Sequence, residues 1–199
     1  MAHPFSAVPL GFAVMGASTL WWGGCAWDSF AIPHVVDLEP DVLVATRCPG
    51  CDSPHAWVID RDRPPLGEQV GELLDALRQA GARLAVCTNK FEGLSKSLLG
   101  QLGLEARFGA VAGRDTFAVC KPDPGHLTGA IAMVGGSIGR AVMVGDSEVD
   151  VATAVAARVP CIGVSFGYTP RHISELGADA VIDHYREFLP ALVRVLRRH

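Results

Sequence analysis

The chain has 199 residues, of which 49% are hydrophobic and 19% are charged, and it contains 22 glycines and 13 prolines. This length allows one domain of ordinary size with a sizeable buried core. The formal net charge is −4 at pH 7, and no block of lysine and arginine occurs before the arginine-rich last turn. The charge therefore counts against a nucleic-acid partner and against a surface for anionic membranes.

The cysteines are spread through apolar and loop contexts and form no dense framework, which favours a reducing cytoplasm over a disulfide scaffold. The apolar run from Val8 to Trp22 has no lysine or arginine before it and contains Pro9. It is also too short to span a bilayer. We therefore predict a cytoplasmic protein with no signal peptide and no membrane partner. The six cysteines are Cys25, Cys48, Cys51, Cys87, Cys120 and Cys161.

The pattern of apolar and polar residues changes near residue 63. Residues 1–63 are irregular, with plausible strands at Val42–Thr46 and Ala56–Ile59, whereas helical and strand patterns alternate regularly beyond Pro64. Regular alternation is typical of a parallel sheet covered by helices. The predicted fold class is α/β: a Rossmann-like parallel sheet flanked by helices (residues 64–199), preceded by a small irregular β-containing N-terminal segment (residues 1–63).

Apolar residues at i, i+3, i+4 and i+7 predict a helix over residues 67–80, which Gly81 would end. The last helix has an apolar stripe made of Leu189, Leu192, Val193 and Leu196. Further helices are predicted at 95–102, after Pro124, and at 149–157. Strands are predicted at 83–87, 110–113, 141–144, 161–165 and 180–182.

Three polar groups follow successive predicted strands, where open parallel sheets bind ligands. Thr88 and Asn89 follow the strand at 83–87 and offer a hydroxyl and an amide to an anion, although Thr-Asn is also a common turn. Lys121 stands before Pro122-Asp-Pro124 in a stiff loop, although a surface lysine is the plainer interpretation. Asp146 and Asp150 begin a helix four residues apart, which suits one hard cation or an ordinary helix cap.

Together, a hydroxyl donor, a lysine and a pair of carboxylates at one edge of a sheet predict phosphoryl chemistry. Mg²⁺ and Lys121 would neutralise the phosphoryl oxygens while Thr88 and Asn89 hold them. The predicted substrate is a small phosphorylated molecule, and the sequence indicates no oligomeric state.

Residues 64–199 resemble the haloacid dehalogenase superfamily, and within it the phosphoglycolate phosphatases. The matching stretches are Leu84–Lys90, Leu102–Phe108, Lys121–Pro124, Val144–Asp150, Gly163–Tyr168 and Gly177–Asp183. The resemblance implies that Thr88 binds phosphate, that Lys121 steadies the nucleophile and the phosphoryl group, and that Asp146 and Asp150 lie at Mg²⁺. Arg158 stands where the family has a glycine.

The family's nucleophile is the first Asp of an Asp-x-Asp-Gly-Thr/Val motif, which this sequence lacks. The nearest candidate is Asp60 with Asp62, because they follow an apolar run and would supply a nucleophile and a general acid or base. Asp60 would also face the metal. However, Arg63-Pro64 stands where Gly-Thr is expected, only 28 positions separate Asp60 from Thr88 (88 − 60), and the alternative is a solvated pair of charges at a strand end.

Cys25 and Asp28 lie three residues apart, so a carboxylate can exchange a proton beside a thiolate on one helical turn. The alternative is a buried cysteine beside a helix-capping Asp. Residues 20–59 resemble part of the organomercurial (alkylmercury) lyases, which implies that Cys25 binds mercury and Asp28 takes part in protonating carbon. Cys48 and Cys51 have the spacing of half a zinc site, but no second pair exists.

Three functions follow from these observations. The first is a Mg²⁺-dependent phosphatase with a replaced N-terminal segment. The second is a mercury-binding or carbon–mercury lyase protein that uses Cys25 and Asp28. The third is a non-catalytic fusion or remnant that keeps the sheet.

Overall fold

The structure is a computed structural model that describes residues 5–6, 12–15, 20–23, 41–47, 54–60, 67–165 and 171–198. The chain forms two compact units, Met1–Glu68 (the first unit) and Gln69–His199 (the second unit). The boundary between the two units lies a few residues beyond residue 63, where the sequence pattern changes. No helix among the described residues is long and apolar enough to cross a membrane.

The first unit contains one antiparallel sheet with the strand order β1-β3-β2-β4-β5. The strands predicted at 42–46 and 56–59 are confirmed as β4 and β5. Val42 and Val44 are 1% and 0% exposed, and Leu43 between them is only half-buried, which is the period of two expected when a sheet buries one face. The strands are β1 (Phe5–Ser6), β2 (Phe12–Met15), β3 (Leu20–Gly23), β4 (Asp41–Arg47) and β5 (Pro54–Asp60).

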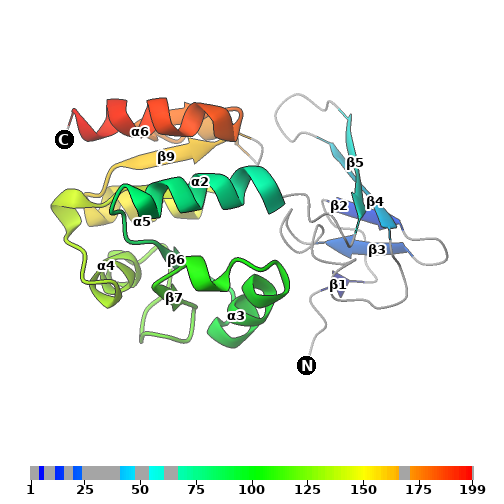
Figure 1. Ribbon diagram of the computed structural model, residues 1–199, viewed down its shortest axis with the longest axis horizontal. Helices are drawn as coiled ribbons and strands as arrows, with labels where there is room; N and C mark the ends of the chain where they lie inside the picture. The colour runs from blue at the N-terminus through cyan, green and yellow to red at the C-terminus, as the bar shows by residue number, and fades with distance from the viewer. Residues whose placement is uncertain are drawn as a thin grey trace. The chain divides into compact units, whose positions relative to one another are not determined.

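The second unit alternates helices with strands, as predicted (Figure 1). Its helices are α2 (Gly67–Gln79), α3 (Glu92–Gln101), α4 (Pro124–Met133), α5 (Glu148–Ala157) and α6 (Phe188–Leu196). Its strands are β6 (Ala85–Cys87), β7 (Ala110–Ala112), β8 (Met143–Gly145), β9 (Cys161–Val164) and β10 (Ala180–Ile182).

The five strands of the second unit are all parallel to their neighbours, which confirms the predicted α/β class. They form two ladders, one with the order β10-β9-β8 and one that joins β6 to β7. Within the described part of the chain, β6 pairs only with β7 and β8 only with β9. The sequence pattern identifies the strands but not this division, because periodicity reports which residues are buried and not which strands pair.

Helices cover both faces of the β10-β9-β8 ladder. Ile162 and Val164 of β9 pack with Leu73 of α2 and with α6, and Figure 1 shows both helices alongside β9. Cys161 points to the opposite face, where it packs with Leu127 of α4 and with α5. The alternation of successive β9 side chains between two apolar layers explains why this strand reads as a continuous apolar run.

The β6-β7 ladder has its own apolar layer, in which Val111 of β7 packs with Leu99 of α3 and with Leu74 of α2. Helix α4 packs against β6, β7 and α5. It therefore links the two ladders and sits beside the loops that follow their strands.

The apolar stripe noted in the sequence is not the buried face of the last helix. Phe188, Ala191 and Val195 of α6 are buried, at 6%, 2% and 0% exposure. Because this helix is apolar on nearly every side, the spacing alone could not show which stripe meets the sheet. Three members of the predicted stripe are instead exposed: Leu189, Val193 and Leu196.

Candidate active site

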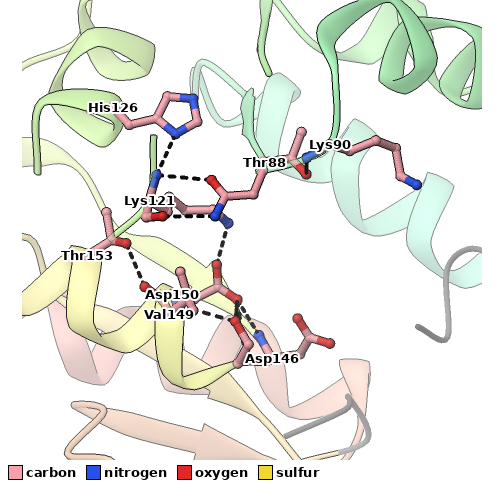
Figure 2. Close-up of polar contacts among 10 residues, drawn as sticks. Thr88, Lys90, Lys121, His126, Asp146, Val149, Asp150 and Thr153 are labelled. Atoms are coloured by element: carbon pink, nitrogen blue, oxygen red, sulfur yellow. Dashed lines mark hydrogen bonds and ion pairs between the residues drawn. The ribbon is translucent and has the colours of Figure 1, made fainter. Parts of the chain in front are cut away.

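The candidate site lies at the carboxyl ends of three strands of the second unit. Thr88 follows β6, Lys121 lies in the connection from β7 to α4, and Asp146 follows β8. Since the strands of each ladder are parallel, such loops gather at one edge. Hydrogen bonds link Lys121 to Asp150 and Asp150 to the backbone of Asp146, and Figure 2 shows Thr88 in the same group.

Lys121 and Asp150 form a buried ion pair. The distance from Lys121 Nζ to Asp150 Oδ1 is 2.5 Å, and the two side chains are 10% and 7% exposed. An ion pair withdrawn from water is much less screened than one on the surface. Lys121 is therefore a fixed cation rather than a surface lysine.

The second oxygen of Asp150 organises the loop after β8. Asp150 Oδ2 accepts hydrogen bonds from Ser147 Oγ at 2.7 Å, from Ser147 N at 3.1 Å and from Asp146 N at 3.2 Å. Ser147 Oγ in turn accepts from Asp150 N, which completes a capping box at the start of α5. Asp150 thus belongs to the capping box in which Ser147 is the N-cap, and it is also the partner of Lys121.

The prediction that Asp146 and Asp150 bear on one cation stays a prediction, but the surroundings of the two carboxylates differ. Both oxygens of Asp150 already accept hydrogen bonds from the protein. Figure 2 shows the carboxylate of Asp146 pointing away from Asp150. Of the two, Asp146 is the better candidate to meet a metal, and Asp150 shapes the loop that presents it.

Asn89 and His126 hold the backbone of Lys121, and Figure 2 shows the bond to His126. Asn89 Nδ2 donates to the Lys121 carbonyl at 2.9 Å, and Lys121 N donates to Asn89 Oδ1 at 3.0 Å and to His126 Nδ1 at 3.1 Å. Asn89, predicted to bind phosphate, thus uses both ends of its amide on Lys121.

The tautomer of His126 follows from its two partners. A backbone N–H can only donate, so Nδ1 of His126 accepts from Lys121, and Nε2 carries the hydrogen that it donates to the Gly113 carbonyl at 3.0 Å. The ring is 0% exposed, and burial lowers the pKa of His126 although the Gly113 carbonyl opposes the shift. His126 is therefore a neutral, fully buried ring.

Thr88 is a half-buried hydroxyl beside this group. Its backbone N–H bonds to the Ala112 carbonyl at 2.9 Å, and its Oγ1 accepts from Lys90 N at 3.1 Å. Because a hydroxyl carries one hydrogen of its own, an oxygen that accepts from Lys90 can still donate to an anion.

The groups around the site hold their protons firmly. Burial raises the pKa of the Cys87 thiol to about 11, so the residue before Thr88 is neutral at physiological pH. Burial, with the negative charge of Asp146, raises the pKa of Tyr185 to about 12. Neither group is poised as a base or nucleophile at neutral pH.

The residues fit a Mg²⁺ ion that the protein binds through few ligands. Within the described ranges, no group of three or more His, Cys, Asp or Glu side chains gathers to hold a metal. Mg²⁺ is commonly bound by one or two carboxylates, with phosphate oxygens and water completing its shell. Asp146 supplies such a carboxylate at a strand end.

The remaining predicted site residues belong to the first unit. Asp60 ends β5, which pairs along its length with β4 in an antiparallel ladder that sets Asp60 opposite Asp41. The strand that carries Asp60 therefore belongs to the sheet of the first unit. Asp62, Cys25 and Asp28 lie outside the described residues, as do Cys48 and Cys51.

Sequence reasoning missed two residues of this group, Ser147 and His126. Ser147 was detectable, because Ser followed three residues later by an acidic side chain is the signature of a capping box. His126 had no such signal. Its partners Lys121 and Gly113 are 5 and 13 positions away, and only the folded loop brings them together.

Comparison with known proteins agrees with this geometry. Residues 31–158 match the family described as haloacid dehalogenase-like hydrolase, and this chain belongs to that family. Within it, the similar curated proteins are phosphoglycolate phosphatases. The protein of Mesorhizobium japonicum is 50% identical over 137 residues, which are 69% of this chain and 55% of the relative. That of Caulobacter vibrioides is 44% identical over 186 residues, which are 94% of this chain and 70% of the relative.

Solved structures give the same relationship. A predicted phosphoglycolate phosphatase of Haemophilus somnus matches with a TM-score of 0.60 and 25% identity, over 71% of this chain and 59% of that chain. CbbY of Rhodobacter sphaeroides, solved with phosphate, matches with a TM-score of 0.57 and 29% identity, over 63% of this chain and 58% of that chain. The chain spans about half the length of the Mesorhizobium japonicum relative.

The Caulobacter vibrioides match covers so much of the chain that it includes most of the first unit. A phosphoglycolate phosphatase thus shares sequence with both units. None of the relatives named above is an organomercurial lyase, and the resemblance of residues 20–59 to that family stays a prediction.

Proposed function

We propose that this protein is a Mg²⁺-dependent phosphatase of small phosphorylated metabolites, with phosphoglycolate as the first substrate to test. One observation carries the proposal. A lysine is buried against a carboxylate at the strand ends, with a threonine hydroxyl and a second carboxylate beside it. The names of the relatives supply phosphoglycolate as the candidate.

The residues of the second unit would bind and orient the phosphoryl group. Lys121 brings a positive charge that its bond to Asp150 fixes in place, and Thr88 donates a hydrogen bond to a phosphoryl oxygen. Asp146 would hold Mg²⁺, which when bound neutralises part of the phosphoryl charge. In this proposal the second unit binds the phosphoryl group and Mg²⁺ but does not supply the group that attacks phosphorus.

The attacking group is the open part of the proposal. Asp60 is the candidate nucleophile, because its carboxylate could form a bond to phosphorus and give an aspartyl-phosphate that water then hydrolyses. Asp62 is the candidate to donate a proton to the leaving alkoxide and later to take one from water. Both assignments rest on the sequence.

A direct assay tests the proposal. We expect the purified protein to release phosphate from phosphoglycolate with Mg²⁺, and to lose this activity with EDTA or in Asp146→Asn. The matched control is Asp75→Asn, which removes a carboxylate of α2 that pairs with Arg107. A wild-type protein without turnover, or Asp146→Asn as active as Asp75→Asn, would refute the proposal.

Asp60→Asn separates the proposal from its nearest alternative, a remnant that binds phosphate and Mg²⁺ without turnover. That alternative draws on the absence of the Asp-x-Asp-Gly-Thr/Val motif from the sequence. Loss of hydrolysis in Asp60→Asn with phosphate binding intact supports Asp60 as the nucleophile. Binding of inorganic phosphate by a wild-type protein that hydrolyses nothing supports the remnant.

A further inference from the structure

We propose that Asn89 and His126 are positioning residues that clamp the backbone of Lys121, so that its ammonium group is held at Asp150 and presented to a phosphate. The first half of this statement concerns Lys121 alone. The second half, the presentation to phosphate, rests on the proposed function.

The clamp holds both polar backbone groups of Lys121, the N–H of one peptide unit and the carbonyl of the next. The amide of Asn89 donates to the Lys121 carbonyl at 2.9 Å and accepts from the Lys121 N–H at 3.0 Å. His126 Nδ1 shares the same N–H at 3.1 Å. The N–H thus makes a three-centre bond to two acceptors while the carbonyl accepts from Asn89, so the peptide units on both sides of the Lys121 Cα have protein partners.

The clamp is anchored to the sheet through His126. The ring is 0% exposed, and Nε2 donates to the carbonyl of Gly113, the residue directly after β7. Phe117 packs edge-on against the ring, with centroids 5.8 Å apart and an interplanar angle of 77°. Asn89 lies two residues after β6. The backbone of Lys121 is thus tied to the ends of both strands of one ladder, while its side chain reaches Asp150 of α5.

Such a clamp matters because lysine is a long, flexible side chain. Holding an ammonium group in one position costs side-chain entropy unless the chain around it is already fixed. A cation that is preorganised before the phosphate arrives stabilises developing negative charge without rearranging. A buried apolar side chain at position 126 would fill the same space, but it would leave the Lys121 N–H with Asn89 alone and the Gly113 carbonyl without this donor.

The two bonds of His126 can be separated by substitution. His126→Asn places a side-chain oxygen near the position of Nδ1, so it keeps the acceptor for Lys121 and loses the bond to Gly113. His126→Gln reaches the position of Nε2, so it keeps the bond to Gly113 and loses the acceptor. His126→Leu loses both. The matched control is His172→Leu. His172 is an exposed histidine that directly precedes the 3₁₀ turn Ile173–Glu175.

The first measurement follows Lys121 directly and needs no enzymatic activity. The sequence has three lysines, Lys90, Lys96 and Lys121, so labelling lysine with ¹³C at Cε gives three NMR signals, and Lys121→Arg identifies one of them. We expect a dispersed Lys121 signal in the wild type, in His126→Asn and in His172→Leu. We expect the chemical shift of this signal to move toward that of free lysine in His126→Gln and His126→Leu. The change should be largest in the double variant Asn89→Leu/His126→Leu. The Lys96 signal reports whether the fold persists.

The second measurement titrates inorganic phosphate into the same variants with Mg²⁺ present. Loss of both clamping residues should weaken phosphate binding about tenfold, since each hydrogen bond has a modest net effect and the two share one donor. His126→Asn should bind within about twofold of the wild type.

An unchanged Lys121 signal in a folded Asn89→Leu/His126→Leu protein would overturn the clamp. If that double variant does not fold, the two single variants test the clamp instead. A Lys121 signal that stays dispersed in His126→Gln but moves to the free-lysine position in His126→Asn would overturn the clamp. If the NMR pattern holds but no variant and no wild type binds phosphate, the clamp stands and the proposed function fails.

Discussion

Lys121 and Asp150 form an ion pair whose energetics differ from those of a surface pair. Both side chains are about nine-tenths buried, so removal of one partner leaves the other charged group desolvated and uncompensated. Asp150 also accepts three hydrogen bonds within its own loop. Loss of Lys121 therefore exposes the loop after β8 to an unbalanced negative charge.

We expect Lys121→Met to lower the free energy of unfolding by about 3 kcal/mol. The control is Lys96→Met, because Lys96 also contacts a carboxylate, Glu92, at 2.6 Å, but the two side chains are 48% and 29% exposed. Its loss should cost much less than the loss of Lys121, because water and salt screen an exposed pair. Urea denaturation of both variants measures the difference, and equal losses would contradict the burial argument.

The sequence predicted which residues meet at the site better than it predicted what each one does. Thr88 and Asp146 were selected because they follow apolar runs, and Lys121 because it lies in a proline-stiffened loop; such loops converge at the strand ends of a parallel sheet. It could not show that Asn89 turns both ends of its amide to Lys121. That contact joins residues 32 positions apart, and only the packed loops determine it.

Arg158 offers a separate test at the residue scale. It ends α5 with φ 55° and ψ 38°, a left-handed conformation that glycine adopts without strain. This explains why the resemblance to phosphoglycolate phosphatases implies a glycine here. A side chain in this region costs about 1–2 kcal/mol.

We expect Arg158→Gly to raise the free energy of unfolding by about 1 kcal/mol, because the strain relieved exceeds the added entropy of the unfolded chain. Arg140→Gly is the control, since Arg140 is exposed and has no positive φ. It should lower stability by about 0.5 kcal/mol. Thermal denaturation of the two variants should therefore give shifts of opposite sign.

At the scale of elements, the tight turn from β8 into α5 is the part of the site with least room. A Cβ at Gly145 would lie 2.3 Å from Asp150 Cβ and 2.8 Å from Asp150 Oδ2. The carboxylate can approach the backbone N–H groups of the loop only because residue 145 lacks a side chain.

Gly145→Ala should lower the free energy of unfolding by about 2–3 kcal/mol and weaken phosphate binding, because Asp150 must move away from Lys121. Gly139→Ala is the control, since a Cβ there meets nothing within 4 Å, and its effect should stay within about 0.5 kcal/mol. Urea denaturation and phosphate titration check both properties. Unimpaired phosphate binding in Gly145→Ala would contradict the assigned role of the turn.

Helix positions were predictable, whereas the buried face of α6 was not. Boundaries such as that of α2 follow from apolar spacing and from Gly81, which has φ 86° just after the helix. In α6 the apolar residues surround the axis, so the tertiary contacts of Phe188 and Val195 decide the orientation.

For the whole molecule, the second unit joins two short ladders through helix α4 and the polar group around Lys121. Asn89 follows β6, Lys121 precedes α4, and Asp150 belongs to α5 after β8. Hydrogen bonds through these three residues cross from one ladder to the other. Lys121, which is proposed to bind phosphate, therefore also helps to hold the unit together, and its substitution should affect binding and stability together.

Alkaline pH tests how completely the second unit excludes water. Burial raises the pKa of Cys87 to about 11 and that of Cys161 to about 12, well above the ordinary value of a cysteine thiol. The unfolded chain would lose these protons from about pH 9, while the folded chain keeps them. The stability that the neutral thiols provide is thus complete below pH 9 and is lost as the pH rises toward 11 and 12.

We therefore expect the free energy of unfolding to fall steadily above pH 9 in urea titrations. The slope of this fall should be smaller in Cys161→Ala, whatever its stability at neutral pH, because one titrating group has been removed. The comparison uses slopes and not midpoints, since deleting a buried thiol also leaves a small cavity. If the slopes of Cys161→Ala and the wild type are equal, the thiol of Cys161 is reached by water in the folded protein, and the packing of β9 between α4 and α6 is looser than its burial indicates.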